Sequence, residues 1–152
     1  MYTIAKDPRI WEQHPCDRYK RTEFERFFSE SIQSKGALTI LDQQTNQVIG
    51  SSRFKRIKGF QNGIEIGWSF LDRSYWGGAT NKVVKGLMIQ YAFSFIDHIL
   101  FYVAKSNVRS QKAVEKIGAQ KINPSTFPML PRKGEDTLTF MIKKTEYMNM
   151  GH

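Results

Sequence analysis

Residues 73–86, Arg-Ser-Tyr-Trp-Gly-Gly-Ala-Thr-Asn-Lys-Val-Val-Lys-Gly, join an apolar, strand-like run to an apolar, helix-like run. The turn between these runs is rich in glycine, and Lys82 and Lys85 fall in the first turns of the predicted helix. Cations there oppose the helix dipole, at a cost of a few tenths of a kcal/mol up to about 1. Free backbone N–H groups at a helix start, reinforced by lysines, can hold a phosphate group. We interpret the turn as a phosphate cradle, and the alternative is an ordinary tight connection.

Two common phosphate-binding motifs are missing from this stretch. It lacks the glycine, four residues and Gly-Lys-Ser/Thr of a P-loop. It also lacks the Gly-x-Gly-x-x-Gly fingerprint of dinucleotide-binding proteins. What remains is a turn whose small residues let backbone amides approach a ligand closely, with Asn81 as the predicted helix cap.

The composition is typical of one globular domain. The chain has 152 residues, of which 40% are hydrophobic and 24% charged, and this length is sufficient for a hydrophobic core. No apolar run reaches the roughly 20 residues of a membrane-spanning helix, and the first residues lack the zones of a secretory signal. Cys16 is the single cysteine, and no Cys/His spacing of a metal site occurs. We expect a cytoplasmic protein without a metal or a membrane partner.

The net charge of +9 leaves two interpretations open. One is a solvated basic surface, and the other is an anionic partner, either a phosphorylated cofactor or nucleic acid. Basic residues gather at residues 53–58 and at Arg109, Lys112 and Lys116. No signature of a nucleic-acid-binding fold accompanies them, so we do not expect a nucleic-acid partner, but the charge alone does not decide between the two interpretations.

The hydrophobic periodicity predicts alternating helices and strands. Helices are expected at 3–13, 20–34, 81–96 and 108–117, and strands at 37–41, 48–57, 63–71, 99–103, 120–122 and 137–143. In the strand at 63–71, Ile64, Ile66, Trp68 and Phe70 alternate with smaller or polar residues. In the helix at 81–96, the expected buried stripe is Val84, Leu87, Met88, Tyr91 and Phe95. The order predicts one mixed α/β domain over residues 1–148, with a tail at 149–152.

A second motif lies at residues 105–119, Lys-Ser-Asn-Val-Arg-Ser-Gln-Lys-Ala-Val-Glu-Lys-Ile-Gly-Ala. Asn107 stands where a strand gives way to a helix, which is typical of a helix cap. Arg109, Lys112 and Lys116 share one face of the predicted helix.

Together the two segments resemble the GCN5-related N-acetyltransferase (GNAT) superfamily, and within it the ribosomal-protein-alanine acetyltransferase-like branch. The matching residues are Glu65-Ile66-Gly67-Trp68, Tyr75 to Asn81, Asn107-x-x-Ser110 and Glu115 to Ala119. The resemblance implies a mixed, largely antiparallel central sheet flanked by helices, without the family's usual first strand. It also implies acetyl-CoA as co-substrate and an amine as acceptor.

The resemblance further implies where acetyl-CoA binds. In that family the pattern Arg/Gln-x-x-Gly-x-Gly/Ala forms the pyrophosphate loop, and Trp76, Ala79 and Asn81 take its three positions here. The strands before the turn and before Asn107 would splay apart, and the backbone of Phe70 and Leu71 would pair with pantetheine. The implied cofactor-binding residues are Phe70, Leu71, Trp76, Gly77, Gly78, Ala79, Thr80, Asn81, Lys82, Asn107, Ser110 and Lys112.

Acetyl transfer to an amine needs a neutral nucleophile and a group that accepts its proton. Glu65 is the only acid on the central strand and is the candidate base; a solvated or salt-bridged strand residue is the alternative. Many family members use a tyrosine to protonate the departing thiolate, but Val114 occupies that position, which leaves Ser110 as the nearest hydroxyl. His14 and Cys16 flank Pro15 and are interpreted as loop residues.

Three functions therefore stay open. The first is an acetyl-CoA-dependent N-acetyltransferase acting on a primary amine, either a protein N-terminus or a small amine. The second is a non-catalytic acyl-CoA-binding domain, and the third is a ribosome- or RNA-associated module that uses residues 53–58. The chain also begins inside the family's first helix, so we expect an exposed sheet edge next to the second strand, and a homodimer is one way to cover it.

Overall fold

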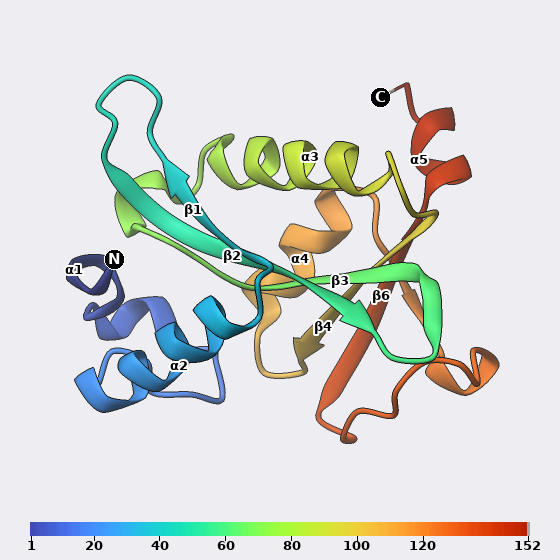
Figure 1. The fold of residues 1–152 in the computed structure, drawn as a ribbon, viewed down its shortest axis with the longest axis horizontal. Helices are drawn as coiled ribbons and strands as arrows, with labels where there is room; N and C mark the ends of the chain where they lie inside the picture. Colours follow the sequence, from blue (N-terminus) through green and yellow to red (C-terminus); the bar gives the residue numbers. More distant parts are fainter. Residues whose placement is uncertain (152) are drawn as a thin grey trace.

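One sheet of six strands, in the order β1-β2-β3-β4-β6-β5, forms the centre of the computed structural model, which describes residues 1–151 (Figure 1). The strands are β1 (Ala37–Leu41), β2 (Val48–Ile57), β3 (Phe60–Leu71), β4 (His98–Ala104), β5 (Gln120–Ile122) and β6 (Thr137–Lys143). Every neighbouring pair is antiparallel except β3 and β4, which are parallel. The predicted mixed and largely antiparallel sheet is confirmed.

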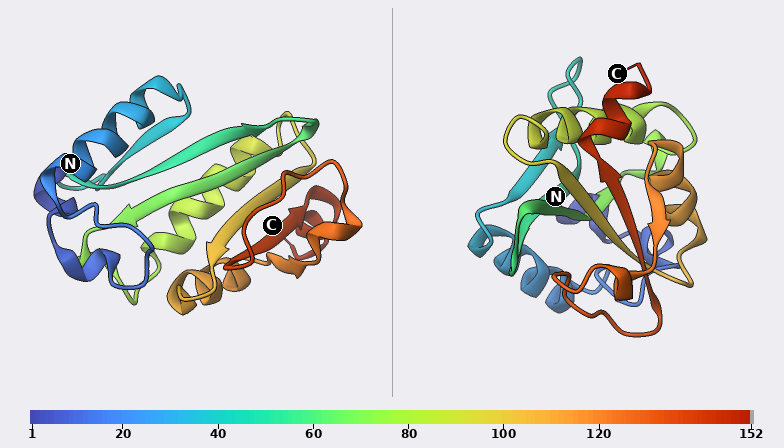
Figure 2. Two further views of the ribbon diagram at one scale, coloured as in Figure 1. Left: turned by 90° about the horizontal axis from the view of Figure 1, so that it is seen from below. Right: turned by 90° about the vertical axis from the view of Figure 1, so that its right-hand side faces the viewer.

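Helices cover both faces of this sheet (Figure 2). They are α1 (Tyr2–Ala5), α2 (Arg21–Gln33), α3 (Thr80–Ala92), α4 (Val108–Lys116) and α5 (Lys144–Asn149), with the short turns η1 (Pro8–Trp11), η2 (Arg73–Tyr75) and η3 (Pro124–Thr126). We call the side on which α3 and α4 pack the α3 face, and the opposite side the α2 face. The predicted tail at 149–152 extends to His152, which lies outside the described residues.

The predicted helix at 3–13 is wrong, because the chain breaks between α1 and η1. Pro8 lacks a backbone N–H and disfavours a helical conformation at the residue before it. The side chain of Asp7 instead accepts a hydrogen bond from the Arg9 N–H at 3.0 Å and starts η1. The break lets η1 turn away from α1 and lie near the end of β3.

The buried stripe of α3 is also not the predicted one. Lys85, Met88, Ile89 and Ala92 are its buried residues, whereas Leu87, Tyr91 and Phe95 are 64%, 63% and 54% exposed. The helix carries apolar residues on two sides, so its sequence alone does not decide which side faces the sheet. Met88, Ile89 and Ala92 pack with Ile64, Ile66, Ile99, Phe140 and Ile142 in the main core.

A β-bulge divides β3 into two parts. The register with β2 shifts between Ser51 and Arg53, opposite Phe70 and Gly67, and Trp68 has a φ of 52°. An extra residue in a bulge reverses the alternation of side chains beyond it. The prediction that Ile64, Ile66, Trp68 and Phe70 share one face is therefore wrong: the isoleucines pack in the main core, and Trp68 and Phe70 pack with α1 and α2.

Strands β3 and β4 separate soon after they meet. Their pairing comprises Gly63 with His98, Ile64 with Ile99 and Glu65 with Leu100, and ends there. Strand β3 continues to Leu71 and β4 to Ala104 without pairing with each other. The splay implied by the family resemblance is therefore present, and it begins at Glu65.

The α2 face carries two separate apolar clusters. One joins Ala5, Ile10, Trp11, Phe24, Phe27 and Phe70 under α1, η1 and α2. The other joins Ile57, Leu100, Leu130 and Met141 under the loop that precedes β6. Polar side chains lie on the same face between them, notably Arg53, Glu65 and Tyr102.

Strand β1 forms one edge of the sheet, as expected for the strand beside β2. Leu38 and Leu41 on this strand are 41% and 50% exposed. Pairing of this edge with a second copy of the chain stays a prediction. Within residues 1–151 no helix combines the length and apolar character needed to cross a membrane.

Candidate functional site

The glycine-rich turn presents a row of free backbone amides. The N–H of Trp76 bonds to Arg73 and that of Val83 to Ala79, but among the described residues no acceptor is found for the N–H groups of residues 77–82. Gly77 has a φ of 75°, and a Cβ added to Gly77 or Gly78 would meet no atom within 4 Å. Six free amides at the start of a 13-residue helix match the expected anion cradle.

The helix begins one residue earlier than predicted. Ala79 is its N-cap, with no side-chain cap bond, and Thr80 and Asn81 lie inside its first turn. The prediction that Asn81 caps the helix is therefore wrong. Because no side chain caps this end, its N–H groups stay available to a ligand.

Lys82 and Lys85 point to different environments. Lys82 is exposed in the first turn, as a phosphate-binding lysine requires. Lys85 is only 6% exposed and donates hydrogen bonds to Ser69 and, at 3.2 Å, to Ser52. Burial lowers the pKa of Lys85 to about 7. The prediction that Lys85 reinforces the cradle is wrong, because its amine faces the sheet.

Trp76 folds back over the end of β3. Its indole Nε1 donates to the Leu71 carbonyl at 3.1 Å, and the Arg109 guanidinium lies 4.0 Å from its ring centre. The Leu71 carbonyl, predicted to pair with pantetheine, therefore already has a donor. Phe70 is 4% exposed and packs under α1 and α2, so only its backbone borders the splay.

The start of α4 borders the splay from the side of β4. Asn107 is the N-cap, with its Oδ1 accepting from the Ser110 N–H at 3.1 Å, which confirms its capping role. Asn107 is 3% exposed, and its Nδ2 lies 3.5 Å from His14 Nε2. Ser110 is half-buried and Lys112 is exposed.

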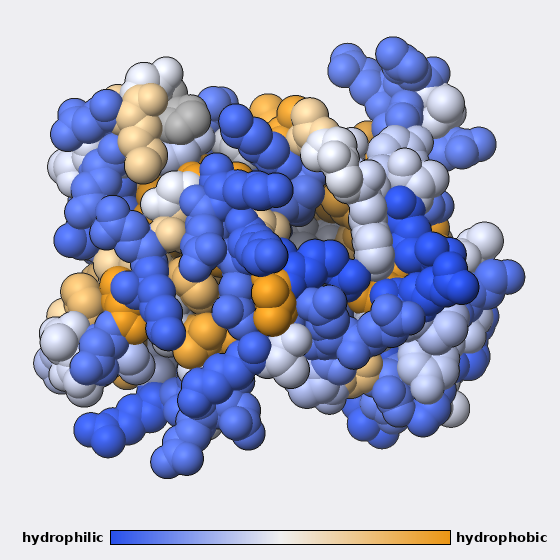
Figure 3. All heavy atoms as spheres, turned by 180° about the vertical axis from the view of Figure 1, so that it is seen from behind, coloured by the Kyte–Doolittle hydropathy of each residue, from blue (hydrophilic) through white to orange (hydrophobic). Residues whose placement is uncertain are grey.

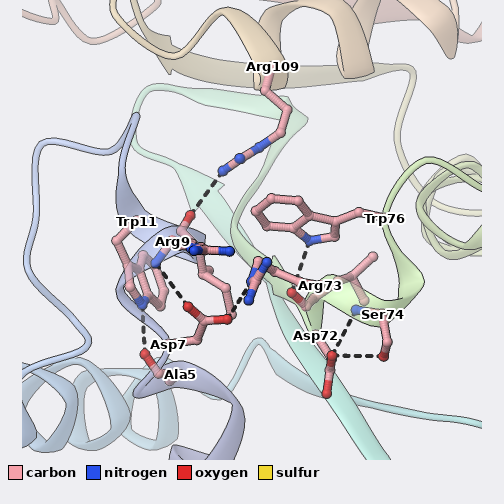
Figure 4. A network of polar contacts seen from close by, with 11 residues as sticks. Ala5, Asp7, Arg9, Trp11, Asp72, Arg73, Ser74, Trp76 and Arg109 are labelled. Atoms are coloured by element: carbon pink, nitrogen blue, oxygen red, sulfur yellow. Dashed lines mark hydrogen bonds and ion pairs between the residues drawn. The ribbon is translucent and has the colours of Figure 1, made fainter.

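Residues 7–14 join these segments across the end of the sheet (Figure 4). The Arg109 guanidinium donates to the Ile10 carbonyl at 2.9 Å, and the backbone N–H of Arg109 donates to Gln13 Oε1 at 3.0 Å. Arg73 donates to Asp7. Sequence reasoning missed these contacts, because their partners are 66 to 99 residues apart and no local pattern links them.

His14 is enclosed in this network. Burial, together with the neighbouring cations Arg18 and Arg109, lowers the pKa of His14 to about 4. The imidazole is therefore neutral at physiological pH, and it packs at 5.3 Å from the Trp11 ring. The interpretation of His14 and Cys16 as a plain loop pair is incomplete for His14, which contacts Asn107.

Glu65 lies at the point where the strands separate. The residue is 8% exposed, and within residues 1–151 its carboxylate makes no hydrogen bond and no ion pair below 4.0 Å. Burial raises the pKa of this carboxyl, and the positive charges of Lys133, Lys55 and Arg53 partly oppose the rise. The alternative of a solvated strand residue is wrong. A buried carboxylate with a raised pKa is suited to accept a proton near neutral pH.

Arg53 and Tyr102 flank Glu65 from the neighbouring strands. Arg53 on β2 is 6% exposed and donates to Ser31, but its Nε has no partner. The Tyr102 hydroxyl on β4 is likewise enclosed without a partner, and burial, with the charge of Glu65, raises its pKa to about 12. The sequence offered one signal for this group: Arg53 and Lys55 alternate on the strand that precedes Glu65.

Hydrophilic side chains cover most of the face shown in Figure 3, with separate apolar patches among them. In the described part of the chain, no group of three or more His, Cys, Asp or Glu residues could hold a metal ion.

Comparisons with known proteins identify the family. The sequence model of the Acetyltransferase (GNAT) domain family matches residues 1–120. No curated protein sequence matches the chain.

Solved structures share the fold. A GCN5-related N-acetyltransferase from Brucella melitensis has a TM-score of 0.76 at 17% identity, over 97% of this chain and 69% of that one. An acetyltransferase of the GNAT family from Bacillus anthracis has a TM-score of 0.70 at 15% identity, and the match covers 95% of this chain and 87% of that one. Spermidine N-acetyltransferase from Vibrio cholerae, in complex with CoA and spermine, has a TM-score of 0.69 at 16% identity, and the match covers 97% of this chain and 90% of that one.

Proposed function

The chain belongs to the GNAT family of acetyltransferases, and from this premise we propose that it moves an acetyl group from acetyl-CoA to a primary amine. The observation that carries the proposal is the splay at Glu65, with six free amides beyond its end. The resemblance to the ribosomal-protein-alanine branch is the reason to include a protein N-terminus among the acceptors, beside small amines.

The residues around the splay fit acetyl-CoA. The free N–H groups of residues 77–82 and the exposed amine of Lys82 would hold the pyrophosphate. The unpaired edge of β3 would hold the pantetheine arm, as an added strand would. The proposed cofactor set is therefore the backbone of Phe70 and Leu71, residues 76–82, Asn107, Ser110 and Lys112.

When bound, acetyl-CoA supplies the acetyl group as a thioester. The net reaction forms the N–C bond of an amide and breaks the C–S bond, while one proton leaves the amine nitrogen and one reaches the sulfur. Glu65 accepts the proton of the amine, directly or through water, because its pKa is raised by burial. Ser110 is the hydroxyl that would serve the sulfur, since Val114 is buried in the core and carries no proton donor.

The second candidate is a non-catalytic acyl-CoA-binding domain. Val114 at the position of the usual tyrosine favours it, and so does the Trp76 indole on the Leu71 carbonyl. The third candidate, an RNA-associated module, would rely on the exposed Lys55, Arg56 and Lys58 of the stretch 53–58, because Arg53 is buried.

Two measurements separate these candidates. Calorimetry with acetyl-CoA tests the cradle, and thiol release with a panel of primary amines tests transfer. Binding together with amine-dependent thiol release supports the proposal. Binding without thiol release supports the acyl-CoA-binding domain, and no binding contradicts both.

A further inference from the structure

The charges around Glu65 are unbalanced. Lys55, Lys133 and Arg53 act electrostatically on its carboxylate, and Arg18 acts on Arg53. Glu30 on α2 is the one other acid that acts on these arginines. None of the ion pairs found within residues 1–151 includes any of these residues. Three cations therefore act on one buried carboxylate, and a fourth, Arg18, acts on Arg53.

Arg53 is held in place but not neutralised. Its guanidinium lies 4.5 Å from the ring centre of Trp68 and 5.6 Å from that of Phe27. It donates one hydrogen bond to Ser31, while its enclosed Nε has no acceptor. Burying a cation that makes no ion pair is unfavourable unless other contacts offset it. The planar, oriented guanidinium is the group that binds carboxylates best.

The other side of Glu65 offers a second donor and a second cation. The Tyr102 hydroxyl is enclosed without a partner, and the Lys133 amine lies 4.5 Å from the Tyr102 ring centre. Strand β2 thus supplies a cation on one side of Glu65, and β4 with the loop before β6 supplies a hydroxyl and a cation on the other.

We propose that the acceptor is an amine that also carries a carboxylate, with Arg53, Lys133 and Tyr102 binding the carboxylate while Glu65 faces the amine. This inference rests on the proposed function and names its substrate class. Nearby cations disfavour the protonated form of the acceptor amine, so they also favour the neutral nucleophile. Acceptors with several positive charges would be repelled from the same group.

The first experiment compares matched acceptors. Rates of thiol release would be measured for alanine against alaninamide, for the dipeptide amides Glu-Ala-NH₂ against Gln-Ala-NH₂, and for spermidine. Charge-assisted hydrogen bonds are stronger than neutral ones, so we expect kcat/KM to favour the carboxylate member of at least one pair by about tenfold or more. The first pair tests whether the acceptor is a free amino acid, and the second tests whether it is the N-terminus of an acidic peptide. Equal rates within both pairs, or a preference for spermidine, would overturn the inference.

Matched variants assign the preference to these residues. Lys133→Met should reduce the ratio of kcat/KM between the two acceptors of a pair several-fold, because one cation beside the acceptor's carboxylate is lost. Lys121→Met is the control, because Lys121 lies opposite Phe140 of the α3-face core, and it should leave the ratio unchanged. Arg53→Lys keeps the charge but loses the planar fork, so it should also reduce the ratio; its fold is checked by circular dichroism. An unchanged ratio in both Lys133→Met and folded Arg53→Lys would contradict the assignment.

A binding measurement keeps this inference separate from catalysis. If no amine in the panel yields thiol, the proposed function fails, but calorimetry with N-acetylalanine and N-acetylalaninamide still tests the site. Tighter binding of the carboxylate compound, lost in Lys133→Met, supports the inference. Equal binding of the two compounds refutes it.

Discussion

Two polar groups are buried on opposite faces of the same sheet, and they differ in how they are satisfied. On the α3 face, Lys85 donates to the hydroxyls of Ser52 and Ser69, which lie 2.7 Å from each other. On the α2 face, Glu65 has no hydrogen bond among residues 1–151, and Arg53 and Tyr102 each keep an unpartnered atom. A satisfied buried group belongs to the scaffold, whereas an unsatisfied set beside a strand separation indicates a binding site.

The two groups also predict opposite responses to pH. The pKa of Lys85 is lowered in the folded chain, so the unfolded chain binds more protons between about pH 7 and 10.5, and stability rises with pH across that window. The pKa of Glu65 is raised, so the folded chain binds more protons above the usual value of 4.5, and stability falls as pH rises there.

The largest expected effect is the loss of turnover in Glu65→Gln. Removing the proton acceptor should lower kcat by about 10²–10⁴-fold, the range of general base catalysis. The free energy of unfolding should stay the same or increase at pH 8, because a buried charge is removed. Thiol release and urea unfolding measure the two effects. Unchanged turnover would remove Glu65 from the mechanism.

The second effect concerns stability on the α3 face. Lys85→Met replaces a buried amine by an apolar chain of similar length, so it should raise the free energy of unfolding by a few kcal/mol at pH 6. The gain over the native chain should shrink as pH rises to about 10. Urea unfolding of both chains at several pH values measures it. A gain that does not depend on pH would contradict a lowered pKa for Lys85.

Two neighbouring glycines give a smaller, paired prediction. Gly77 has a positive φ, so Gly77→Ala should cost about 1 kcal/mol of stability and weaken acetyl-CoA binding. Gly78→Ala meets no neighbouring atom and has no positive φ, so its stability should change by less than about 0.5 kcal/mol. Equal losses in both variants would argue against a conformational role for Gly77.

The smallest effect is expected for Lys82→Met. An exposed lysine beside a phosphate contributes about 0.2–1 kcal/mol, so the dissociation constant for acetyl-CoA should rise up to about fivefold. The salt dependence of binding should decrease with it. The control is Lys116→Met. Lys116 is exposed at the C-terminal end of α4, away from the turn at residues 77–82, so this variant should bind acetyl-CoA as the native chain does.

The sequence predicted the strands and the fold class, because period-two patterns and turn residues are local signals. It failed where distant residues decide the outcome. Which side of α3 is buried depends on the sheet beneath it, so the stripe with Leu87 and Tyr91 was wrong. The side chains of β3 change face at the bulge near Trp68, and no residue type requires a bulge there.

The candidate site divides in the same way. The turn at residues 77–82 and the cap at Asn107 could be predicted, because glycines and a capping asparagine act on their own backbone. Glu65 could be predicted as an acid on the central strand. Lys133 could not, because it acts on Glu65 from a loop far along the chain, whereas Arg53 and Lys55 lie on the strand that precedes Glu65.

The docking of residues 7–14 has a consequence for the order of folding. Its contacts with Arg73 and Arg109 join positions 66 and 99 residues apart, so they close very long loops and form slowly. During synthesis this segment leaves the ribosome before its partner Arg109, which is translated about a hundred residues later. The segment that borders the splay therefore forms its contacts only after Arg109 has been made, and we expect its amides to exchange hydrogen sooner than those of the β4–β6 ladder.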